Sequence, residues 1–348
     1  MTRSLAILTV RNEAAFLLEW LAHHKAVGFT DFLIFSNDCS DGTEAMLERL
    51  AQMGEIIHVP NPAPHPRGPQ WEALKQASAH PAFKATDWAM VLDVDEFINI
   101  HTGDGTLGAL RAALPEATAI PLTWRIFGNG GVVKYTDKPV TEVFTKAAPV
   151  LMGWPWRAAM FKTYFRADGT YAKLGVHRPR APNKARLGAA RWFDGAGNEL
   201  DDAFKTTRLF SPLGQDNYQL AQLNHYPLGA METYLLKVDR GRSNREDGVM
   251  GMDYWCERNW ASEEDLTIAR MAPARDALWA RYAADDRLGD LHAKAVLWRR
   301  EKFAELMLED ANRALFGRMV ITPPARPAPP QLSNYIFEFA HKARQISE

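Results

Sequence analysis

The chain has 348 residues, 47% of them hydrophobic and 24% charged, with a formal net charge of −1. This balance is typical of a soluble globular enzyme and gives no electrostatic reason to expect nucleic-acid binding. Two distant cysteines exclude a disulfide framework, and no apolar run approaches the roughly 18 residues of a membrane-spanning helix.

Strands and helices alternate along the first 130 residues. Short apolar runs predict buried strands at residues 5–10, 32–35, 56–59, 87–93 and 119–127. Apolar positions with helical spacing predict helices through residues 16–21, 43–50, 70–79 and 103–114. This alternation predicts an α/β fold with a mostly parallel, doubly wound sheet.

The second half of the chain is less regular. It predicts short strands at 159–165 and 171–174, a helix at 230–241, and later helices at 265–284, 291–315 and 334–346. A Pro-rich linker is expected at 322–330. We therefore expect an α/β domain over residues 1–250 and a helical extension over 251–348. The apolar face of the last helix is expected to dock on the core rather than anchor a membrane.

The most informative stretch is an apolar run that ends in three acids. Trp88–Leu92 is followed by Asp93, Asp95 and Glu96. On an extended backbone Asp93 and Asp95 would point the same way, and a divalent cation such as Mg²⁺ or Mn²⁺ would relieve their repulsion. The alternative is a solvated acidic loop. Glu96 is expected to support the site or to cap the turn.

Two common nucleotide-binding motifs are missing. No Gly-x-Gly-x-x-Gly follows the first strand, and no phosphate loop with Gly-Lys-Ser/Thr occurs. A nicotinamide dehydrogenase and an ATPase are therefore disfavoured.

Several stretches in order resemble one enzyme class. They are Val10–Glu13, Glu19–His24, Ser36–Thr43, Asp93–Phe97, Trp124–Gly128, Asn224–Tyr226 and Lys237–Gly241. Together they resemble the GT-A glycosyltransferases, in particular the bacterial family-2-like group related to the DUF23 (family 92) enzymes. The resemblance covers about residues 4–245 and implies a GT-A fold.

The resemblance implies a nucleotide-sugar donor, with a UDP-sugar favoured, and a divalent metal, Mn²⁺ or Mg²⁺. The implied metal ligands are Asp93, Asp95 and His225, although a lone histidine is more often structural. The implied nucleotide-sugar-binding residues are Val10, Arg11, Asn12, Glu13, Asn37, Asp38, Asp41, Gln70, Lys75, Asp93, Lys237 and Arg240. Arg242 is a further candidate. Two alternatives stay open: residues 37–43 only cap a helix, and the basic residues only complement a helix dipole.

The resemblance also implies inversion at the sugar, which requires a general base. Glu142 is the first candidate and Asp216 the second. For each, the alternative is an ordinary surface carboxylate.

We therefore expect a metal-dependent inverting glycosyltransferase of bacterial origin. Its acceptor would be a glycan or glycolipid, and the setting surface polysaccharide or glycolipid synthesis. The expected location is the cytoplasm, with peripheral contact at the inner membrane still open. The rival functions are a sugar nucleotidyltransferase, which should carry a glycine-rich phosphate loop absent after the first strand, and a non-catalytic sugar-binding protein.

Overall fold

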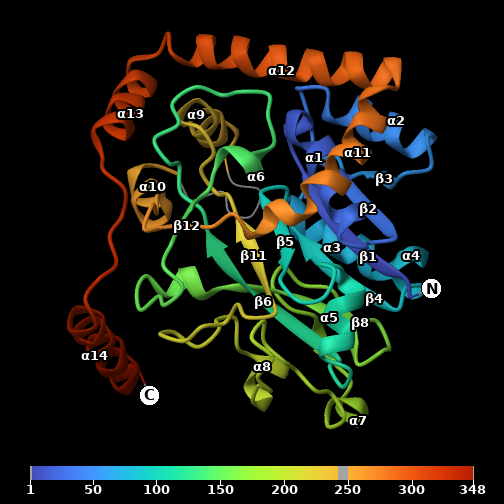
Figure 1. Ribbon diagram of the computed structural model, residues 1–348, viewed down its shortest axis with the longest axis vertical. Helices are drawn as coiled ribbons and strands as arrows, with labels where there is room; N and C mark the ends of the chain where they lie inside the picture. The colour runs from blue at the N-terminus through green and yellow to red at the C-terminus, as the bar shows by residue number, and fades with distance from the viewer. Residues whose placement is uncertain (1, 242–249, 348) are drawn as a thin grey trace.

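An eight-stranded sheet forms the centre of the computed structural model, which describes residues 2–241 and 250–347 (Figure 1). The strands lie in the spatial order β3-β2-β1-β4-β8-β6-β11-β5. Their bounds are Ser4–Val10 (β1), Asp31–Ser36 (β2), Ile57–Pro60 (β3), Trp88–Leu92 (β4), Glu96–Ile100 (β5), Ala119–Ile126 (β6), Phe161–Arg166 (β8) and Ala221–His225 (β11).

Six of these strands run in one direction. β1 is parallel to β2 and β4, β2 is parallel to β3, and β6 is parallel to β11. β8 is antiparallel to both β4 and β6, so β6 runs in the direction of β4, whereas β5 is antiparallel to β11. The predicted mostly parallel α/β sheet is confirmed. The carboxyl ends of β1, β4, β6 and β11 consequently meet at one edge, where ligands bind in such sheets.

Helices and short elements surround this sheet. The helices of the first 240 residues are Ala14–Ala26 (α1), Thr43–Gln52 (α2), Pro69–Ala79 (α3), Pro81–Lys84 (α4), Leu107–Ala113 (α5), Val140–Val143 (α6), Lys184–Leu187 (α7), Asp202–Thr206 (α8) and Met231–Arg240 (α9). Two small sheets pair Tyr171–Lys173 (β9) with Arg180–Pro182 (β10) and Lys146–Ala147 (β7) with Glu263–Glu264 (β12). Single 3₁₀ turns lie at Trp156–Ala159 and Thr267–Met271.

Both faces of the sheet are buried. Along β1, Ala6, Leu8 and Val10 belong to one apolar cluster, and Leu5 and Ile7 belong to a second cluster on the opposite face. The alternation follows from the two-residue period of a strand. Because both faces are covered, residues 5–8 of the strand form an uninterrupted apolar run, as expected for a central parallel strand.

Five helices follow residue 250. They are Met252–Arg258 (α10), Ala272–Ala283 (α11), Asp286–Leu306 (α12), Asp310–Ile321 (α13) and Pro330–Ser347 (α14). α11 packs on α1, and α12 crosses α1, α2 and α9 along the top of the view (Figure 1). The division of the chain at residue 250 stays a prediction. Among the described residues no helix combines the length and apolarity needed to cross a bilayer.

The predicted helix at 291–315 is wrong in one respect, because the chain breaks between α12 and α13. Side chains from α13 satisfy carbonyls at the break: Asn312 donates to Leu306 at 3.0 Å, and Arg313 donates to Leu308 at 2.7 Å. These bonds replace the helical bonds that the last turn of α12 lacks. The last helix begins at Pro330, four residues before its predicted start.

Two buried histidines on α1 should make the fold sensitive to mild acid. Burial lowers the pKa of His23 to about 4 and that of His24 well below its ordinary value. In the unfolded chain both titrate near pH 6.5. Between about pH 6.5 and 4 the unfolded state therefore binds more protons, and stability falls as the pH falls through this window.

We expect the free energy of unfolding to drop by about 2 kcal/mol per histidine between pH 7 and pH 5. Urea unfolding at the two pH values measures this change. His23→Gln is the control, because a glutamine amide can replace the 2.8 Å contact between His23 Nε2 and the Ile98 carbonyl. That variant should show a shallower pH dependence, and an unchanged slope would contradict the assignment.

Candidate functional site

The acidic stretch forms a tight turn between two strands. β4 ends at Leu92 and β5 begins at Glu96, and the Glu96 N–H donates to the Asp93 carbonyl at 3.1 Å. The Glu96 carboxylate accepts from the Asp93 N–H at 2.8 Å, so Glu96 caps the turn. The prediction that Asp93 and Asp95 lie on an extended strand is therefore wrong, because the strand ends before them.

Both aspartates nevertheless line one cavity, of about 500 Å³, which we call the sheet-edge cavity. Val10 at the end of β1 and His225 at the end of β11 also line it. It is also bounded by α10, by residues that precede β8 and by residues that follow β9. The cavity thus lies where the fold brings strand ends together.

Asp93 is held by groups from two other elements. Its Oδ2 accepts from Lys162 of β8 at 2.9 Å, and its Oδ1 accepts from Gln70 of α3 at 3.1 Å. Lys162 is completely buried and also lies 3.4 Å from Glu96. Burial raises the pKa of Glu96 to about 8, and its Oε1 accepts from the Trp124 indole at 2.7 Å. Asp93 therefore has both oxygens engaged.

Asp95 faces a lysine and a histidine. Its Oδ2 accepts from Lys237 of α9 at 2.5 Å, and Lys237 also donates to the Pro227 carbonyl at 2.8 Å. Its Oδ1 lies 3.7 Å from His225 Nε2. Burial alone would raise the pKa of Asp95, but Lys237 and His225 hold it well below its ordinary value. Burial lowers the pKa of His225 despite the neighbouring carboxylate.

The side chains of Asp95 and His225 suit a divalent cation whose remaining coordination positions are filled by a bound ligand. Across the described residues, no three His, Cys, Asp or Glu side chains gather into a candidate metal site. The Asp95 Oδ1 and His225 Nε2 pair nevertheless offers two converging donors, and His225 Nδ1 is buried without a hydrogen-bond partner. Mg²⁺ in particular is commonly held by one or two carboxylates plus substrate phosphates. Asp93, already bonded through both oxygens, fits a supporting position better.

The loop after β1 is fixed by the end of α9. Arg240 pairs with the Glu13 carboxylate and donates to the Arg11 carbonyl at 2.7 Å. Asn12 Oδ1 accepts from the Ser40 N–H at 2.7 Å, which joins the loops after β1 and β2. Arg11, Glu13, Lys237 and Arg240 all line the sheet-edge cavity. Arg242 lies outside the described residues.

The predicted residues in the loop after β2 and on α3 do not line this cavity. Asp41 accepts the N–H groups that begin α1 and α2 at 2.9 Å each, and Asn37 donates to the last carbonyl of β1 at 3.0 Å. Asp38 is exposed at the same loop, and Lys75 pairs with Glu72 on the solvent side of α3. These positions fit the helix-capping and surface alternatives; their role in nucleotide binding stays a prediction.

Neither predicted general base reaches the sheet-edge cavity. Glu142 pairs with Arg275 of α11, and Asp216 accepts from the Tyr218 N–H at 2.9 Å. Another carboxylate, Asp253 of α10, does line the cavity. Among its described acidic lining residues, Asp253 alone has no ion pair or hydrogen bond to the described chain.

Neither Lys162 nor α10 was predicted from the sequence as a part of the site. A lysine between the aromatic residues of the run Phe161–Phe165 is a usable signal, because a charge within a buried strand needs a partner. No comparable signal marks Asp253, since α10 is short and carries no recognisable motif.

Comparison with known proteins identifies one sequence family. Residues 5–185 match the model of glycosyltransferase family 92. Relatives described as glycosyltransferase family 92 proteins come from Oryza sativa subsp. japonica (26% identity over 148 residues), Ricinus communis (30% over 144) and Arabidopsis thaliana (26% over 152). The alignments cover 41%, 39% and 38% of this chain but only 24%, 25% and 24% of the relatives.

Solved structures give a weaker likeness. A crystal structure of S. aureus TarS aligns over 68% of this chain and 40% of its own, with 14% identity and a TM-score of 0.31. A second crystal structure, of TarS 1–349, aligns over 82% of this chain and 73% of its own, with 14% identity and a TM-score of 0.32.

Proposed function

Because the chain belongs to glycosyltransferase family 92, we propose that it is a metal-dependent inverting glycosyltransferase that uses a nucleotide-sugar donor. The family inferred from the sequence motifs is thereby confirmed; a bacterial origin stays a prediction, and the relatives named above are plant proteins. The observation that carries the proposal is the convergence of Asp95, His225 and Lys237 at the carboxyl edge of the sheet.

The charges around the sheet-edge cavity suit a diphosphate. Lys237 and Arg240 present cationic groups beside the loop of β1, and in this proposal they bind the diphosphate oxygens. Asp95 and His225 would hold the cation, with Asp93 in support. A bound Mn²⁺ or Mg²⁺ would act as a Lewis acid that offsets the negative charge of the leaving nucleotide.

The proposal assigns the general base to Asp253. Inversion requires a carboxylate that can accept the proton of the acceptor hydroxyl as that oxygen attacks the sugar. Glu13, Asp93, Asp95 and Glu257, the other acidic residues described around the cavity, are engaged in ion pairs. Asp253 is exposed on α10 and therefore available to an entering acceptor. A glycan or glycolipid acceptor in a bacterial cytoplasm remains part of the proposal.

Calorimetry tests the donor assignment directly. We expect UDP to bind at least tenfold tighter with Mn²⁺ than with EDTA, because the cation joins the diphosphate to Asp95 and His225. GDP is the matched competitor. Equal affinity of both nucleotides with and without metal would contradict the proposal. Incubation with UDP-sugars should release UDP. Release of pyrophosphate from UTP and a sugar 1-phosphate would instead indicate a nucleotidyltransferase.

A further inference from the structure

A second, smaller cavity lies behind the sheet-edge cavity. Its volume is about 70 Å³, and we call it the apolar cavity. Two ion pairs, Asp95 with Lys237 and Glu13 with Arg240, line both cavities and form the wall between them. The apolar cavity is therefore a distinct space that adjoins the proposed transfer site.

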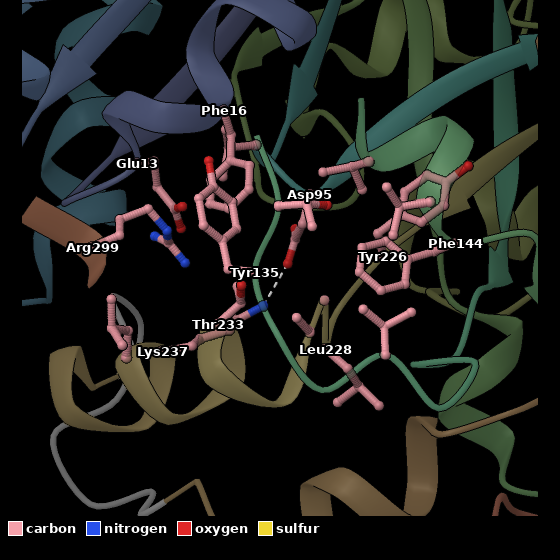
Figure 2. A pocket seen from close by; sticks show the side chains of 18 of the residues that line it. Glu13, Phe16, Asp95, Tyr135, Phe144, Tyr226, Leu228, Thr233, Lys237 and Arg299 are labelled. Carbon is pink, nitrogen blue, oxygen red and sulfur yellow. Dashed lines mark hydrogen bonds and ion pairs between the residues drawn. The ribbon is translucent and has the colours of Figure 1, made fainter. Parts of the chain in front are cut away.

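The apolar cavity has two unlike sides (Figure 2). Phe144, Tyr226 and Leu228 line one side, which offers mainly apolar surface. Glu13 and Arg299 lie on the opposite side, and the Arg299 guanidinium points toward the space between the two sides. An occupant must therefore carry both a polar and an apolar part.

Arg299 is a buried cation without a hydrogen-bond acceptor among the described residues. It comes from α12, its exposed fraction is 5%, and its Nε is buried with no hydrogen-bond partner. Within residues 2–241 and 250–347 it makes no hydrogen bond or ion pair; it stacks on Phe16 and Tyr135 at 4.5 and 5.1 Å from the ring centroids. Burial lowers the pKa of the Arg299 guanidinium.

A second buried arginine differs from Arg299 in having its acceptors within the described chain. Arg275 of α11 is 2% exposed, yet it pairs with Glu142 and Asp276 and donates to Thr141 at 2.6 Å. Burying a charge is costly unless the charge is paired and hydrogen-bonded. Arg275 meets that requirement within the chain. Arg299 has aromatic stacking and the nearby charge of Glu13, but no hydrogen bond within the part of the chain that the structure describes. An oxyanion in the apolar cavity would supply the missing acceptor.

We propose that the apolar cavity binds a compact organic acid, whose carboxylate pairs with Arg299 and whose small apolar body packs against Phe144 and Leu228. A planar guanidinium matches a carboxylate through two parallel hydrogen bonds. A cavity of about 150 Å³ accommodates benzene, so 70 Å³ restricts the occupant to a body of about three or four carbons. Glu13 and Asp95 nearby favour a monoanion over the more highly charged phosphate.

Isobutyrate is a suitable probe, because isobutyramide has the same shape without the charge. In calorimetry on the full chain we expect isobutyrate to bind at least tenfold tighter than isobutyramide, since hydrogen bonds to charged groups are the stronger class. Inorganic phosphate should likewise bind at least tenfold more weakly than isobutyrate. Equal binding of isobutyramide would overturn the role of the charge, and equal binding of phosphate would overturn the role of the apolar body.

Variants of neighbouring arginines locate the site. Arg299→Met should abolish isobutyrate binding without lowering the melting temperature, because it removes an unpaired buried charge. Arg299→Lys keeps the charge but loses the planar fork, so its binding should be weakened. Arg300→Met, at the adjacent exposed position of α12, is the matched control and should bind like the wild type. Binding retained in Arg299→Met, or lost in Arg300→Met, would overturn the proposal.

Discussion

Replacing Asp95 by asparagine should lower kcat/KM for sugar transfer by about 10³-fold, because a metal's charge stabilisation contributes several kcal/mol and each 1.36 kcal/mol is tenfold. The amide would keep the shape of the side chain but would remove the anion that faces His225 and Lys237. The same variant should lose the gain in UDP affinity that Mn²⁺ provides. Steady-state kinetics and calorimetry measure the two effects.

Asp202→Asn is the matched control for this experiment. Asp202 is 92% exposed on α8, pairs with Lys205 and is not among the residues that line the sheet-edge cavity. We expect its kcat/KM to equal that of the wild type. Wild-type kcat/KM in Asp95→Asn, with an unchanged metal effect on UDP, would contradict the assignment of Asp95.

The parts of the site that sequence reasoning reached are those coded by a local pattern. An apolar strand followed by polar residues marks the end of β1 and the Asp93–Asp95 turn, and the parallel sheet then brings such ends together. His225, by contrast, comes only from the resemblance to the GT-A glycosyltransferases, and the structure places it at the end of β11. The prediction that the Asp-x-Asp pair is extended is wrong, because polar residues of this kind occur both in turns and at the starts of strands. The sequence alone does not separate these two cases.

The parts that sequence reasoning missed depend on packing between distant segments. Glu142 was chosen by its order along the chain, but α6 is anchored through its backbone: Val140 and Thr141 donate N–H groups to Glu19 at 2.7 and 3.1 Å. Glu142 is thereby directed to Arg275. Arg299 likewise has no local signal, because an arginine on an amphipathic helix is ordinarily on the solvent side. Only the packing of α12 across α1 and α9 buries it.

Replacing Asp253 by asparagine should reduce kcat by about 10²- to 10⁴-fold, the usual contribution of general acid–base catalysis. An amide cannot accept the proton of the acceptor hydroxyl, but it leaves the donor contacts near Lys237 and Arg240 intact. The KM for the donor and the affinity for UDP should therefore stay within about twofold of the wild-type values. A general loss of donor binding would instead raise KM and would not produce a fall in kcat alone.

Glu142→Gln and Asp216→Asn are the matched carboxylate-to-amide controls, since neither residue lines the sheet-edge cavity. Both variants should keep kcat near that of the wild type, whereas Asp253→Glu should recover part of the lost rate because it restores a carboxylate. A large loss of kcat in Glu142→Gln together with a small loss in Asp253→Asn would transfer the role of base to α6. It would also require Glu142 to leave Arg275 and turn toward the cavity when substrates bind.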